Sequence, residues 1–143
     1  MAWAGVSPYS SRCSAGPLGR LLVRGEFGHD FIDELAPLPG EPVVDKPGYG
    51  AFHQTDLGQI LSNRGIRDLV LTGVTTEVCV HSTLREAVDH GYRCMLASDA
   101  CGSAHPRLHA AALQTVAVEG GLFGRVAASS TLIAELENAQ EAT

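Results

Sequence analysis

Apolar and polar positions alternate along the chain with two different periods, and together they predict strands separated by helices. Two apolar runs, over residues 68–73 and 92–98, are typical of strands that are buried, the first of them on both faces. Two shorter strands are expected over residues 42–46 and 125–128. Helices are expected in four segments: residues 56–64, 78–90, 106–119 and 131–138.

The order of these segments predicts a parallel α/β fold. Because a crossover between parallel strands usually needs a helix, the alternation favours a sheet with helices on both faces. In such sheets the reactive side chains gather at the carboxyl ends of the strands. Lys46 ends the strand at residues 42–46, and residues 73–79 follow the next strand. We therefore expect two reactive side chains to converge at one edge of the sheet.

Cys79 is the candidate nucleophile at this edge. It lies in LVLTGVTTEVCVH, residues 69–81, where a strand passes through a glycine turn into a helix. The N–H groups and the dipole at a helix N-terminus favour the thiolate over the thiol. The same N–H groups can bind an oxyanion when the thiolate attacks a carbonyl.

Composition narrows the function classes. With 143 residues, 45% of them hydrophobic and 18% charged, the chain is expected to form one domain with a substantial core. Its net charge of -6 disfavours nucleic acid and anionic membranes and favours a small neutral or cationic ligand. The sequence has no signal peptide and no long apolar run, so we expect a soluble, cytoplasmic protein whose four cysteines are free thiols.

Several motifs occur in order along the chain. They include DKPGYGAFHQTDLGQIL, which fits K-x-x-x-x-A/S-F-x-x-T-x-L, and GVTTEVCV, which fits G-V-x-T-x-x-C-V. On these motifs the chain resembles the isochorismatase-like cysteine hydrolase superfamily from about residue 24 onward. Within it, the chain is most similar to the biuret hydrolase branch, through RGEFGHDFIDEL, LPGEP, TTEVCVHSTLREA and EGGLFGRVA. The resemblance implies a Rossmann-like three-layer α/β/α fold with a mainly parallel sheet.

The resemblance also assigns roles to residues. It implies that Cys79 is the nucleophile, that Lys46 is its cationic partner, and that the N–H groups of Thr75 and Cys79 form the oxyanion hole. It further implies a non-proline cis peptide bond between Val74 and Thr75. The implied reaction cleaves a C–N bond in a small amide or imide, such as biuret or a ureide, through a thioester-type intermediate.

One residue of the family pattern has no counterpart. The family uses an aspartate at the end of an N-terminal strand as the proton carrier, whereas the first aspartate here is Asp30. Asp45 is a poor substitute because neighbours on a strand point to opposite faces, and His29 has no special claim. We therefore expect an N-terminally incomplete protein: an irregular, disordered leader over residues 1–20, a missing first strand, and a partial hydrolase domain over residues 21–143.

Two other functions stay open. The chain could be a catalytically inactive remnant that acts as a binding or oligomer subunit. Hydrolysis of the vinyl ether of isochorismate is a third interpretation, which the resemblance disfavours because that activity usually does without the cysteine. Members of the superfamily commonly form dimers or tetramers, so a homo-oligomer is expected.

The remaining candidates have a functional and a structural interpretation. Glu119 lies where the biuret-hydrolysing relatives place a substrate-binding glutamine, and it can equally be a solvated charge at a helix end. Tyr49, Phe52 and Phe123 can line the substrate pocket or belong to the core.

Neither a metal nor another cofactor is expected. The six histidines are scattered, and the His105/His109 pair is a helix-face pair with little claim to be a site. Cys94 and Cys101 lie in or just after a strand and are most simply buried small residues.

Overall fold

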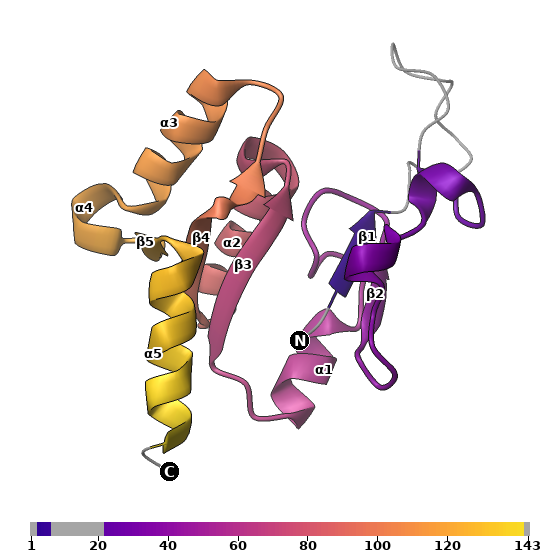
Figure 1. The fold of residues 1–143 in the computed structure, drawn as a ribbon, viewed down its shortest axis with the longest axis horizontal. Coiled ribbons are helices and arrows are strands. Elements are labelled where there is room, and N and C mark those ends of the chain that lie inside the picture. Colours follow the sequence, from indigo (N-terminus) through magenta and orange to yellow (C-terminus); the bar gives the residue numbers. More distant parts are fainter. Residues whose placement is uncertain (1–2, 7–21, 142–143) are drawn as a thin grey trace. The chain divides into compact units, whose positions relative to one another are not determined.

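The computed structural model describes residues 3–6 and 22–141, which form two compact units divided after Gly65 (Figure 1). All of the strand pairs in both units are parallel. Helices accompany the strands, so the structure confirms the predicted α/β class. Each unit is described separately below.

The first unit contains a parallel pair of strands, β1 (Trp3–Val6) and β2 (Val43–Lys46). β1 lies within the segment that was expected to be an irregular leader, so a strand does precede β2, and that part of the prediction was wrong. The four residues WAGV carry no alternating pattern, and the ladder with β2 provides the order that local sequence does not. The rest of the expected leader lies outside the described residues.

Short helical segments complete the first unit. Two 3₁₀ turns, η1 (Phe27–His29) and η2 (Asp33–Leu35), precede β2, and α1 (Leu57–Asn63) follows it. α1 buries Leu57 and Leu61, which are four positions apart and therefore lie on one face of the helix.

The second unit is built on a three-stranded parallel sheet in the order β3–β4–β5. Its strands are β3 (Asp68–Val74), β4 (Arg93–Gly102) and β5 (Arg125–Ala127). The prediction that β3 is covered on both faces was wrong, because Val70 and Val74 are exposed while Leu71 is buried. β4 ends four residues later than predicted, since it rejoins β3 beyond an irregularity described below.

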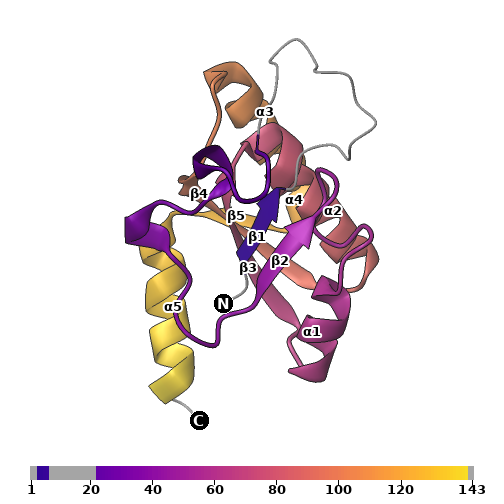
Figure 2. The ribbon, with the colours of Figure 1, turned by 90° about the vertical axis from the view of Figure 1, so that its right-hand side faces the viewer.

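Helices cover both faces of this sheet. Figures 1 and 2 show α2 (His81–Asp89) on one face and α5 (Ser129–Glu141) on the other. Leu84 and Ala87, three positions apart on one face of α2, are completely buried.

The predicted helix over residues 106–119 ends early. It forms α3 (Pro106–Val116), followed by the short α4 (Val118–Gly121). Glu119 and Gly120 have φ of 51° and 76°, which is left-handed backbone that an α-helix does not tolerate. No helix within residues 3–6 and 22–141 has the length and apolar surface that a membrane crossing requires.

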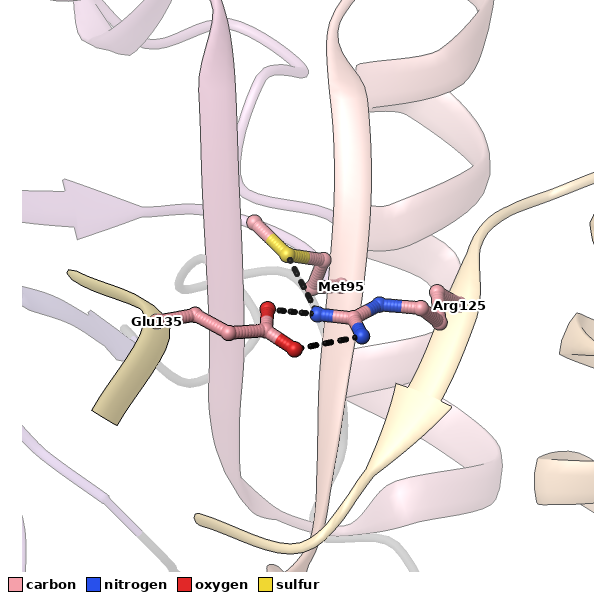
Figure 3. Close-up of polar contacts among 3 residues, drawn as sticks. All are labelled: Met95, Arg125 and Glu135. Carbon is pink, nitrogen blue, oxygen red and sulfur yellow. Dashed lines mark hydrogen bonds and ion pairs between the residues drawn. The ribbon is translucent and has the colours of Figure 1, made fainter. Parts of the chain in front are cut away.

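A polar contact ties β4, β5 and α5 together (Figure 3). The Arg125 guanidinium binds both carboxylate oxygens of Glu135, with 2.9 Å between Nη1 and Oε1. The same guanidinium donates to the Met95 sulfur at 3.6 Å. Both members of the ion pair are about half exposed, so the contact orients α5 more than it stabilises the unit.

Gly124 should be the least replaceable glycine of this unit. A Cβ atom there would lie 2.5 Å from the Cys94 carbonyl oxygen, and φ is 149°. Gly124→Ala is therefore expected to lower the free energy of unfolding by roughly 2–4 kcal/mol, measured by urea titration. Gly58→Ala is the matched control, because Gly58 lies in α1 and its Cβ would meet only the Phe52 side chain, at 3.7 Å. Gly58→Ala should raise the free energy of unfolding by about 0.5–1 kcal/mol.

Arg93 should stabilise the start of the sheet in a pH-dependent way. Its guanidinium donates to both Asp68 carboxylate oxygens at 2.6 Å, and these hydrogen bonds hold the pKa of Asp68 below its ordinary value. A lowered carboxyl pKa adds stability above the unfolded value of about 3.9, which is lost as the pH falls through the folded pKa.

Arg93→Met should accordingly lower the free energy of unfolding at about pH 6, and the difference from the parent should shrink at about pH 2.5. The free energies of unfolding are measured by urea titration at both pH values. Arg107→Met, on the exposed part of α3, is the control. An Arg93→Met effect that is equal at both pH values would contradict the ion pair as its cause.

Candidate active site

The turn that carries Cys79 begins where β3 ends. Gly73 has φ of 115°, a conformation that is open to glycine and costly for other residues. The peptide bond between Val74 and Thr75 is cis, which confirms the prediction made from the resemblance. We call residues 73–80 the cysteine turn.

Cys79 lies in a π-helical turn, η3 (Thr76–Val80), which leads directly into α2. An ordinary helix from residue 78 was predicted; the wider turn starts two residues earlier. π-Helical turns inside helices are frequent at functional sites. The Thr75 carbonyl accepts the N–H groups of Val78 and Val80 at 3.1 and 3.2 Å. The Cys79 thiol is half-buried and is not part of a disulfide.

Side chains beside Cys79 attach η3 to the segment that follows β4. Thr76 is completely buried, and its hydroxyl lies 3.0 Å from the Gly102 carbonyl and 2.9 Å from His109 Nδ1. The Ser103 hydroxyl donates to Glu77 Oε1 at 2.8 Å. The sequence analysis did not identify these contacts, because they join residues 26 to 33 positions apart.

Two titratable groups flank Cys79. The pKa of Glu77 lies below its ordinary value, first because of its own backbone N–H and then because of the Ser103 hydroxyl, so it is a carboxylate near neutral pH. Burial, and then the charge of Arg85, lowers the pKa of His81, which favours neutral imidazole. Glu77 Oε2 and His81 Nε2 are both buried and have no hydrogen-bond partner among the described residues.

Lys46, the only lysine of the sequence, is buried at the end of β2 with 3% of its surface exposed. Its Nζ donates to the carbonyl oxygens of Gly48 and Tyr49 at 2.9 and 2.7 Å. Such contacts compensate a buried ammonium for the water it has lost. Asp45 points to the other face, as predicted, and pairs with Arg24 at 2.5 Å. Lys46 and Cys79 belong to different units, and their pairing stays a prediction.

The two aromatic candidates of the first unit differ in exposure. Phe52 is buried and lies against α1, which fits its interpretation as core. Tyr49 is half exposed, and its backbone carbonyl is one of the acceptors for Lys46. His29, the weak candidate base, has a buried Nε2 with no hydrogen-bond partner among the described residues.

Glu119 lies at the opposite edge of the sheet from Cys79. The cysteine turn follows the carboxyl end of β3, whereas Glu119 comes after α3 has returned to the amino ends of the strands. The next residues, Gly120 and Gly121, line a hollow of about 520 Å³ together with Tyr92 and Arg93 at the start of β4. The structure therefore does not bring Glu119 together with Cys79 inside the second unit.

The other described cysteines have structural environments. Cys94 is buried, and burial raises its pKa to about 11, so the thiol is neutral near pH 7. Burial also raises the pKa of Cys101, which is half-buried beside Gly73 in the ladder. Within residues 3–6 and 22–141 no cluster of three or more His, Cys, Asp or Glu side chains could hold a metal ion.

Comparison with known proteins places this site in context. The model of the family described as Isochorismatase domain matches residues 8–130. The chain is similar to an isochorismatase-like hydrolase from Alkaliphilus metalliredigens, with 32% identity, a TM-score of 0.81, and coverage of 94% of this chain and 72% of that chain. It is also similar to an N-carbamoylsarcosine amidase from Thermoplasma acidophilum, with 28% identity, a TM-score of 0.75, and coverage of 90% and 71%. A third similar structure is a nicotinamidase from Bacillus subtilis, with 25% identity, a TM-score of 0.78, and coverage of 88% of this chain and 73% of that chain.

Proposed function

Because this chain belongs to the isochorismatase domain family, we propose that it is a cysteine hydrolase that cleaves a C–N bond in a small amide or urea derivative. The observation that carries the proposal is the half-buried Cys79 in a π-helical turn that follows the carboxyl end of β3 and leads into α2. The names of two structural neighbours, an N-carbamoylsarcosine amidase and a nicotinamidase, support amides as the substrate class.

In the proposed reaction, the Cys79 thiolate attacks the carbonyl carbon, and the carbonyl electron pair moves to the oxygen. The oxyanion is bound by the backbone N–H groups of Thr75 and Cys79. This choice agrees with the geometry of the turn, since the N–H groups of Val78 and Val80 are already bonded to the Thr75 carbonyl. Collapse breaks the C–N bond, and the amine leaves as it takes up, through water, the proton that the Cys79 thiol lost when the thiolate formed.

Water then attacks the thioester, which releases the acid and restores the thiol. Lys46 acts as the cation that favours the Cys79 thiolate and its developing oxyanion. Its burial at the end of a parallel strand supports this role, because a buried ammonium seldom serves a purely structural purpose.

Substrate identity is the finer part of the proposal. Biuret or a ureide is favoured by the motifs shared with the biuret hydrolase branch. Glu119 is left out of the proposed site because it lies at the far edge of the sheet. Tyr49, exposed beside Lys46, is kept as a candidate wall of the substrate pocket, and Phe52 as support beneath it. A homo-oligomer in the cytoplasm stays a prediction.

Replacement of the nucleophile tests the reaction class. Ammonia release is measured with biuret, ureidoglycolate, nicotinamide and N-carbamoylsarcosine as substrates. Cys79→Ala should lower kcat/KM by about 10³-fold or more, because it removes the sulfur that forms the proposed thioester. Cys94→Ala is the matched control, since its neutral buried thiol lies at the start of β4. Absence of turnover by the parent on every substrate would contradict the proposal and support the binding or assembly role instead.

Replacement of the proposed cation tests the pairing across the two units. Lys46→Met should lower kcat/KM by about 100-fold, because it removes the charge that favours the thiolate and the oxyanion. It should also slow the alkylation of Cys79 by iodoacetamide, followed by mass spectrometry. Arg24→Met, which removes the ion pair on the other face of β2, should change neither rate. Unchanged alkylation in Lys46→Met would show that the two side chains do not form a pair.

A further inference from the structure

We propose that His109, on α3, is a positioning residue for Cys79 and acts through the buried hydroxyl of Thr76. The inference deepens the proposed function and shares with it only the assumption that Cys79 is the nucleophile. It gives one member of the His105/His109 pair a role that needs no metal ion.

The hydrogen bonds of Thr76 determine what His109 must do. A threonine hydroxyl has one hydrogen to donate and can accept others. The Gly102 carbonyl, 3.0 Å away, is an acceptor only, so it takes that hydrogen. His109 Nδ1, 2.9 Å from the same oxygen, must then carry a proton and donate. In the chain Nδ1–H to Oγ1–H to carbonyl, the hydroxyl of this fully buried side chain both accepts and donates a hydrogen bond.

A second set of contacts starts from the next residue of η3. The Ser103 hydroxyl donates to Glu77 Oε1 at 2.8 Å and accepts the His105 N–H at 2.9 Å. Two consecutive residues of the π-helical turn are therefore tied to residues 102–109, the end of β4 and the start of α3. Cys79 follows them by two and three positions on the same turn.

The contacts that hold the cysteine turn matter for catalysis because nucleophilic attack is sensitive to geometry. A displacement of about 1 Å in a reacting group can cost about 100-fold in rate. The cysteine turn has no regular α-helical hydrogen bonds before α2, so its shape depends on side-chain contacts more than that of an ordinary helix start. His109 supplies the donor at the most deeply buried of these contacts.

The test compares three substitutions of His109. Asn places an amide N–H close to the position of Nδ1, Gln places one near Nε2, and Leu has no donor. We expect His109→Leu and His109→Gln to lower kcat on the best amide substrate by about tenfold with little change in KM, and His109→Asn to recover most of the loss. Thr115→Val is the matched control, because Thr115 bonds only within the exposed part of α3.

A second readout does not require turnover. The alkylation of each cysteine by iodoacetamide is followed by mass spectrometry at one fixed pH. In His109→Leu, Cys79 should react about threefold more slowly, because the π-helical turn that fixes the position of its thiol loses the donor to the buried Thr76 hydroxyl. Buried Cys94 and half-buried Cys101 should react as in the parent, whereas general loosening of the unit would expose all three thiols.

Thr76→Val provides an independent variant at the other end of the contact. If His109 acts through Thr76, the double variant Thr76→Val/His109→Leu should be no slower in Cys79 alkylation than either single variant. Additive effects, or equal behaviour of His109→Asn and His109→Gln, would overturn the proposal. A parent enzyme without amide turnover would overturn the proposed function while the alkylation series still decides the role of His109.

Discussion

The carboxyl edge of the second unit depends on one interruption of the ladder between β3 and β4. Leu71 pairs with Leu96, and the next pair is Gly73 with Cys101, so one residue intervenes on β3 and four on β4. The additional residues let Asp99 leave the ladder and accept the backbone N–H of Ser129 at 2.7 Å, where α5 begins. β4 then returns beside β3, which brings the Gly102 carbonyl to the Thr76 hydroxyl.

Most elements of the fold could be predicted from the sequence, because their signals are local. Apolar runs and helical spacing located β2, β3, α1 and β5 to within two residues. The elements that were missed or misjudged depend on partners far away in the chain. β1 is ordered by its ladder with β2, β4 is lengthened by rejoining β3, and α5 starts two residues early where Asp99 accepts its first N–H.

The candidate site was predictable to a smaller extent. Local pattern alone identified Cys79 at a strand-to-helix turn, whereas the cis bond before Thr75 came only from the resemblance to a family. The contacts of Thr76 and Glu77 were not predictable, since they require knowing where α3 begins relative to η3. Glu119 was assigned from the resemblance alone, whereas the order of β4 and α3 along the chain already places it at the other edge of the sheet.

β2 carries opposite charges at consecutive positions on opposite faces, Asp45 toward Arg24 and Lys46 toward the carbonyl oxygens of Gly48 and Tyr49. A slip of β2 by one residue against its neighbour would exchange the two faces. The Asp45 carboxylate would then face the carbonyl oxygens of Gly48 and Tyr49, which cannot donate to it, and the Lys46 ammonium would face Arg24. Misregistered forms of β2 are therefore penalised by electrostatics as well as by lost apolar burial, so Asp45 and Lys46 help to specify the alignment of the strand that carries them.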